Sequence, residues 1–161
     1  MTINFLASAT ITQGAGAVPA IQSDQFGLQQ INRVGFAAHT ANAATSGAIP
    51  TWTAVEFDLK NNFNAGTGKF TASIAGNYFF KYYQLVNHAT AGEYRAILLL
   101  NGSGITGRSI FYKINSNVHT TIQVEARVNL NVGDWVSAYI EVAPAAMAAD
   151  AGWSFFQGYR I

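Results

Sequence analysis

The amino-acid sequence predicts an all-β protein built as a two-layer sandwich. Apolar and polar residues alternate with a period of two in one segment after another, and the spacing of an amphipathic helix is hardly seen. The alternating segments are short, recur about every 8–12 residues and are divided by turns rich in Gly and Asn, which is typical of a sandwich. The 161 residues fit one such domain.

The first half of the chain contains an unusual strand. Residues 77–86 read NYFFKYYQLV, and both sets of alternate residues are apolar. Tyr78, Phe80 and Tyr82 share one face, and Phe79 and Tyr83 share the other. A strand with one wet face would place polar residues on that side, so this strand is predicted to be dry on both sides. The other strands predicted in this half cover residues 34–40, 53–59 and 69–74.

The second half shows the clearest alternation. Residues 120–130, TTIQVEARVNL, place apolar residues on one face and Gln, Glu, Arg and Asn on the other, and the turn NVGD joins them to the alternating residues 135–142 as a hairpin. Residues 94–102 read as a strand that ends in a turn at Asn101 and Gly102, a dipeptide that tolerates positive φ. The remaining predicted strands cover residues 109–114 and 153–161.

Two segments differ from the strands. Residues 1–32 are rich in small and amide side chains and contain GAGAVPA, so we expect an arm that precedes a domain of residues 33–161. Residues 143–152 form an Ala-rich loop with Met147 and Asp150. This loop is either an ordinary connection or a tip that contacts a partner through those two residues.

The composition excludes several classes of protein. Only 11% of residues are charged and the formal net charge is +1 without a basic cluster, which argues against binding nucleic acid. There is no cysteine, so disulfides and thiolate metal sites are excluded. The chain begins at Met1 without the pattern of a signal peptide, and no apolar run is long enough to insert into a membrane.

No arrangement of residues typical of an enzyme is present. His39, His88 and His119 lack the close spacing of zinc ligands, and the carboxylates form no Asp-x-Asp calcium loop. Glu125 and Arg127 lie two residues apart on a polar face, where an ion pair within or between subunits competes with simple solvation. The three tryptophans, which either stack on sugar rings or fill a core or interface, are Trp52, Trp135 and Trp153.

The stretch around the dry strand resembles a known family. Phe63, Phe70 and Gly76 are followed by Tyr78, Phe80 and Tyr82, in the segments TGKFT and GNYFFKY. This pattern is similar to the aromatic signature of the globular head of complement C1q, a tumour-necrosis-factor-like jelly roll. VGFAAHT, VEFD, LLLNG, NVGDWV and SFFQGYRI also resemble head segments in the right order, so the resemblance covers residues 33–161. The chain departs from the family between Phe57 and Phe63, where the connection is shorter, and residues 1–32 have no counterpart and no collagen repeat.

The resemblance implies a compact homotrimer of jelly-roll sandwiches. One face of the dry strand would then fill the core and the other would meet neighbouring subunits, and the pattern leaves open which face does which. Some family members bind calcium, and we expect no cofactor here because no motif supports one. The aromatic residues expected in the core or the trimer interface are Phe70, Tyr78, Phe79, Phe80, Tyr82, Tyr83, Trp135, Phe155 and Tyr159.

Two functions fit these expectations. The first is a non-enzymatic structural or adhesive protein of a virion, most simply a bacteriophage head decoration, fibre or tail tip, whose arm of residues 1–32 binds other virion proteins. The low charge and the wealth of Ala, Asn, Thr and Gly favour it. The alternative is a secreted or surface-bound bacterial recognition module for a glycan or protein receptor.

Overall fold

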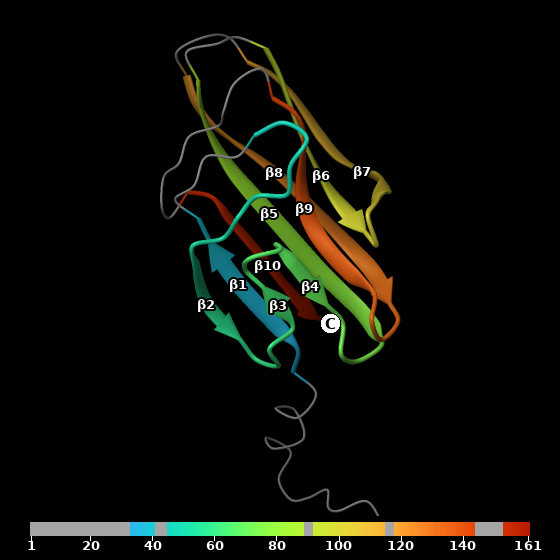
Figure 1. Ribbon diagram of the computed structural model, residues 1–161. Helices are drawn as coiled ribbons and strands as arrows, with labels where there is room; N and C mark the ends of the chain where they lie inside the picture. Colours follow the sequence, from blue (N-terminus) through green and yellow to red (C-terminus); the bar gives the residue numbers. More distant parts are fainter. Residues whose placement is uncertain (1–32, 41–44, 89–91, 115–117, 144–152) are drawn as a thin grey trace, which may run out of the picture. The chain divides into compact units, whose positions relative to one another are not determined.

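The computed structural model describes residues 33–40, 45–88, 92–114, 118–143 and 153–161, which form a sandwich of two antiparallel sheets (Figure 1). Sheet 1 contains, in spatial order, β2 (Ala54–Asp58), β1 (Gly35–His39), β10 (Phe155–Arg160), β5 (Gly76–His88) and β8 (Val118–Leu130). Sheet 2 contains β3 (Phe63–Asn64), β4 (Lys69–Thr71), β9 (Trp135–Val142), β6 (Gly92–Leu100) and β7 (Ser103–Ile114). The prediction of an all-β, two-sheet sandwich is confirmed.

Each predicted strand overlaps an observed one, but two differences have local causes. Strand β3 was not predicted, because two residues are too few to show alternation. Strand β4 ends at Thr71 instead of continuing to residue 74. The backbone N–H of Ala72 donates to the Asp134 carbonyl at 2.8 Å, and the Ala72 carbonyl accepts from Gly133 at 2.8 Å. These bonds tie Ala72 to the β8–β9 turn.

Aromatic side chains from both sheets fill the space between them. Phe70 of β4 lies with its ring centroid 5.2 Å from that of Phe36 in β1 and 5.3 Å from that of Phe80 in β5. Phe156 of β10 packs against Phe36 at 4.9 Å. The sheets are therefore joined by ring-to-ring contacts, which contribute beyond the apolar area they bury.

Two core tyrosines keep a partner for the phenol group. The Tyr78 hydroxyl donates to the Ile74 carbonyl at 2.6 Å, and the Tyr82 hydroxyl donates to Gln84 Oε1 at 2.8 Å. Burial raises the pKa of both phenols, so they stay neutral at physiological pH. The strand thus contributes its hydroxyl-bearing rings to the core without leaving these polar groups unpaired.

The β6–β7 turn is the predicted Asn-Gly turn. Asn101 and Gly102 have φ angles of 51° and 85°, as a two-residue type I′ hairpin requires. The Asn101 side chain is held at both ends: Nδ2 donates to Asp134 Oδ1 at 2.8 Å, and Oδ1 accepts from the Trp135 backbone N–H at 2.9 Å. Asp134 Oδ2 also accepts from the Asn131 backbone N–H at 2.7 Å. We call these four residues the turn clamp.

Replacing Asp134 by asparagine should lower stability at neutral pH and have little effect in acid. Hydrogen bonds from Asn101 and Asn131 lower the pKa of the Asp134 carboxyl below its ordinary value. A lowered folded-state pKa contributes stability above the unfolded pKa of about 3.9, and this stability is lost as pH falls through the folded value. Urea unfolding of Asp134→Asn and the wild type should show midpoints that differ at pH 7 and converge as the pH falls through the folded-state pKa; a difference that stays the same throughout the acid range would contradict the assignment.

Candidate functional site

On β5 and β10, the side of sheet 1 that faces away from the core carries four aromatic side chains. We call this side the aromatic face; its rings are Phe79 and Tyr83 of β5 and Phe155 and Tyr159 of β10. Their neighbours along each strand, Tyr78, Phe80, Tyr82 and Phe156, are fully buried in the core. Since successive strand residues point to opposite faces, the dry strand fills the core with one set of rings and presents the other set outward.

The four outward rings form two cross-strand pairs. Tyr83 lies opposite Phe155 with ring centroids 4.4 Å apart, and Phe79 lies opposite Tyr159 with centroids 5.6 Å apart. Tyr159 is 47% exposed and the other three rings are half-buried. Two aromatic pairs on one face of a sheet, in a protein with few charges, are typical of a site of protein association.

A polar row separates the two aromatic pairs. Gln157, Lys81 and Glu125 lie side by side across β10, β5 and β8. Lys81 Nζ lies 3.8 Å from Glu125 Oε2 and 4.5 Å from the centroid of the Tyr83 ring. Contact with Tyr83, supported by attraction to Glu125, raises the pKa of Lys81, so it stays charged. A charged pair within an apolar surface restricts the ways in which a partner can dock.

The edge of sheet 1 adds a second apolar surface. Strand β2 is one of the two edge strands of this sheet in the part of the chain that the structure describes. Val55 is 41% exposed, Phe57 47%, and Leu59, just beyond the strand, 53%. Exposed edge strands usually carry charge that limits further association. Strand β2 does carry Glu56, whose side chain is 60% exposed, and Asp58, so only its apolar side chains add to the surface available to a partner. The sequence analysis did not single out these three residues, although their spacing of two is visible in TAVEFDL.

The aromatic face is hollowed next to the β2 edge. A cavity of about 260 Å³ is lined by Ala37, His39, Glu56, Phe155 and Gln157, together with Ala38. His39 Nδ1 lies 3.3 Å from Glu56 Oε1. Small side chains on β1 leave this hollow between larger ones, so the surface offers a socket that a side chain of a partner can fill.

The remaining predicted site residues lie elsewhere. Phe70 belongs to the core. Trp135 is half-buried on sheet 2, with Lys69 Nζ 3.9 Å from its ring centroid, so it lies neither in the core nor on the aromatic face. Met147 and Asp150 lie outside the described residues, as does the arm of residues 1–32. Glu125, for which an ion pair and simple solvation were the alternatives, lies 3.8 Å from Lys81 Nζ of the same chain, and its side chain is 53% exposed.

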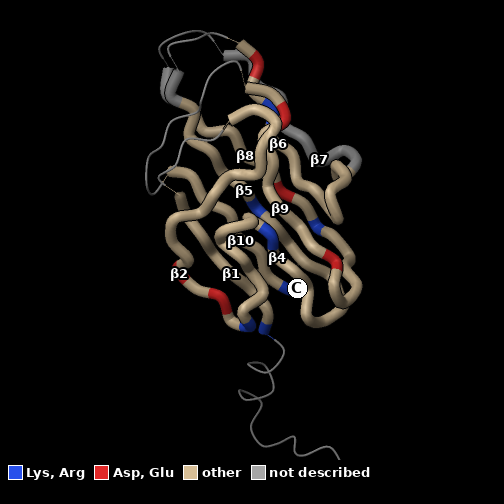
Figure 2. Tube along the Cα trace, in the orientation of Figure 1, with Lys and Arg blue, Asp and Glu red and all other residues tan. Residues whose placement is uncertain are grey.

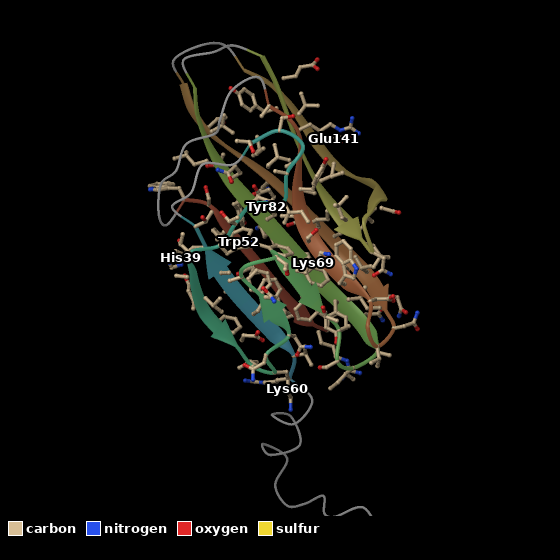
Figure 3. The ribbon with its side chains drawn as sticks, viewed as in Figure 1. His39, Trp52, Lys60, Lys69, Tyr82 and Glu141 are labelled. Atoms are coloured by element: carbon tan, nitrogen blue, oxygen red, sulfur yellow. The ribbon has the colours of Figure 1, made fainter. Side chains whose placement is uncertain are left out.

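A second candidate site lies at one end of the sandwich. A pocket of about 600 Å³, which we call the end pocket, is formed by the β2–β3 turn, β3, β4 and the residues that follow β4. Figure 3 shows Lys60, one of its residues, at the end of the sandwich opposite Glu141. The pocket thus lies beside the connection between Phe57 and Phe63, which is shorter here than in the family that the sequence resembles.

The described residues show no typical metal or membrane site. No group of three or more His, Cys, Asp or Glu side chains comes together within the described ranges. No described helix could cross a membrane. Lys, Arg, Asp and Glu are scattered over the strands and turns that Figure 2 colours, without one gathered patch of either sign.

Comparison with known proteins agrees with this architecture. A sequence model of the C1q domain matches residues 35–161. The globular domain of zebrafish complement 1qA is similar with a TM-score of 0.65 and 19% identity, over 80% of this chain and 97% of that one. Murine APRIL at pH 5.0 has a TM-score of 0.64 and 12% identity, covering 80% and 99%, and the Eiger tumour necrosis factor of S. frugiperda has 0.64 and 13%, covering 81% and 93%.

Proposed function

Because this chain belongs to the C1q domain family, we propose that it is a non-enzymatic trimer that builds or decorates a virus particle. Trimeric assembly is typical of the family, and domains of this type are recognition modules without enzymatic activity. The proposal requires no cofactor. In this proposal the N-terminal arm of the chain, residues 1–32, attaches the trimer to other proteins of the particle.

The aromatic face is the observation that carries the proposal of self-association. Tyr83, Phe155, Phe79 and Tyr159 pair across strands on a surface that also contains the socket beside His39. Permanent interfaces commonly bury about 2,000 Å² or more and are more apolar than other surfaces. Three copies that cover this face together with the β2 edge would remove the outward rings from water.

A role in a virion is supported by composition. With 11% charged residues and a net charge of +1, the chain has little charge to keep single copies apart. Packing of many such subunits on a particle therefore meets little electrostatic repulsion. The proposed partners are the second and third copies of this chain and the particle proteins contacted by residues 1–32.

The experiment follows the protein through density-gradient fractionation of a culture of its source. The full chain should band with particles, and a chain of residues 33–161 should still associate with itself but remain unattached. An antibody against the domain detects the full chain and the shortened chain in each fraction. A full chain found only in the soluble or cell-surface fraction, or a shortened chain that attaches equally well, contradicts the virion role.

A secreted or surface-bound recognition module is the second candidate function. The observation that favours it is the end pocket, an open hollow that is lined in part by amide and hydroxyl side chains and that self-association through the aromatic face does not require. Domains of this family are typically extracellular, which fits binding of a glycan or protein receptor. In the fractionation experiment this function places the protein outside the particle fraction.

A further inference from the structure

The end pocket has a framework that is fixed by its own hydrogen bonds. Asp58 Oδ1 accepts the backbone N–H of Asn62 at 3.0 Å, and Oδ2 accepts that of Phe63 at 2.7 Å. The buried Asn62 side chain donates to the Thr71 carbonyl and accepts from Ser73 Oγ at 3.2 Å. The β2–β3 turn is thereby tied to the end of β4, so the shape of the pocket exists before any ligand binds.

Polar groups that this framework does not use line the opening. The side chains of Lys60 and Asn61 are exposed and make no hydrogen bond or ion pair with the described residues. Asn64 Oδ1 accepts from the Thr67 N–H at 3.1 Å, which leaves the Asn64 amide NH₂ to donate. Ser73 donates its hydroxyl to Asn62, which leaves the Ser73 oxygen to accept. The pocket therefore offers donors and acceptors close together around one hollow.

The chemistry of the lining selects among classes of ligand. The Phe63 ring is stacked on Phe36 with centroids 4.3 Å apart, so it is turned into the core and offers no aromatic surface to an apolar ligand. One lysine without arginine or a helix N-terminus is a poor site for phosphate. Side-chain amides and hydroxyls, by contrast, match the neighbouring hydroxyl groups of a sugar, each of which both donates and accepts.

We propose that the end pocket binds a carbohydrate. Asn61, Asn64 and Ser73 form hydrogen bonds with sugar hydroxyl groups, and Lys60 forms an ion pair with a carboxylate substituent of the sugar. The volume of about 600 Å³ is within the range of small-molecule sites. An open pocket without an aromatic platform binds through hydrogen bonds in competition with water, so the dissociation constant is expected on the order of 1 mM. The inference depends neither on self-association nor on attachment to a particle.

The test uses the full-length protein, labelled with ¹⁵N and deuterium, titrated with 3′-sialyllactose as an acidic probe and lactose as a neutral one. Both sugars should shift backbone amide signals of residues 60–73, and the acidic sugar should bind several-fold more tightly. Lys60→Gln should remove that preference and leave lactose binding unchanged. Asn61→Gly should weaken both sugars at least threefold without lowering the melting temperature, because Asn61 has a φ of 53°, which glycine adopts more readily.

Lys69→Gln is the matched control. It removes the same charge one strand away, at a side chain that lies over Trp135 and does not line the pocket; Figure 3 labels both lysines. It should bind both sugars as the wild type does. The proposal is overturned if neither sugar shifts residues 60–73 or if the shifts lie elsewhere. It is also overturned if Lys60→Gln binds the acidic sugar, or Asn61→Gly binds both sugars, as tightly as Lys69→Gln does.

Discussion

Replacing Tyr83 by arginine should leave the protein folded but unable to associate. Light scattering at micromolar concentration should report a mass near 17.3 kDa, whereas the wild type should report about three times that value. Tyr83 is half-buried on the outward side of β5, so it does not contribute to the core. The substitution therefore acts on the surface that we propose to be buried between subunits.

The physical reason is the cost of covering a charge that has no partner. A guanidinium at position 83 would lie next to Lys81, whose ammonium is 4.5 Å from the ring it replaces. Removing an unpaired charge from water costs several kcal/mol, and each trimer would bury three of them. We expect the dissociation constant to rise by at least about a thousandfold, or about 4 kcal/mol. Tyr83→Ser, which removes the ring without adding charge, should weaken association less.

Tyr139→Arg is the matched control for this prediction. Tyr139 is also a half-buried tyrosine in the middle of a strand, but it points outward from β9 in sheet 2. This variant should keep the mass of the wild type. A folded Tyr83→Arg protein that stays trimeric, or a Tyr139→Arg protein that dissociates to the same extent, would show that the aromatic face is not the interface.

Gly158→Ala should destabilise the protein strongly, because the added methyl group would enter a packed part of the core. Gly158 lies on the core side of β10, and a Cβ atom there would lie 2.3 Å from Cδ1 of Phe80 and 3.0 Å from Cε1 of Phe36. Neither ring can move freely: the Phe80 ring also packs on Phe70 at 5.3 Å, and Phe36 on Phe63 at 4.3 Å. Overpacking of this kind costs about 3 kcal/mol, measured as a fall in the free energy of unfolding in urea.

The double variant identifies the cause of this loss. Phe80→Leu removes ring atoms that meet the new methyl group, so combining it with Gly158→Ala should cost less than the two single changes together, with a coupling of about 1–3 kcal/mol. Gly104→Ala is the control, because its Cβ would meet only Ile97 Cδ1 at 3.6 Å, an ordinary contact. A loss as large in Gly104→Ala, or strict additivity in the double variant, would exclude steric overlap as the reason.

The strands could be predicted from the sequence because alternation is a local property. Residues 120–130 and 135–142 show it without ambiguity, and the structure has β8 and β9 there. The Asn-Gly turn could be predicted for the same reason, since the preference for positive φ belongs to those two residues alone. The missed strand β3 depends instead on pairing with β4, which lies further along the chain.

The assignment of faces could not be predicted in the same way. In residues 77–86 both sets of alternate side chains are aromatic, so hydrophobicity does not decide which set fills the core. Residues of the adjacent strand β10 determine which set faces the core. Gly158 provides room for the Phe80 ring on the core side, and Phe155 packs against Tyr83 on the other side. Trp135 illustrates the same limit, because its half-buried position depends on Lys69 of a different strand.

The end pocket was even less accessible to sequence reasoning. Lys60, Asn61 and Asn64 look like ordinary turn residues. Only the hydrogen bonds that Asp58 and Asn62 accept show that they surround a fixed hollow. The one available signal was the short connection between Phe57 and Phe63.

The turn clamp also bears on chemical ageing. An asparagine followed by glycine is the pair most prone to lose ammonia, because the glycine nitrogen can attack the side-chain carbonyl carbon and close a five-membered imide ring. In Asn101 both atoms attached to that carbon are engaged, Nδ2 by Asp134 and Oδ1 by Trp135. Ring closure requires the Asn101 side chain to turn toward the Gly102 nitrogen, and the two hydrogen bonds hold it in its present orientation. We therefore expect the folded protein to lose ammonia at this turn more slowly than its unfolded chain, because of a carboxylate that is 33 residues away in the sequence.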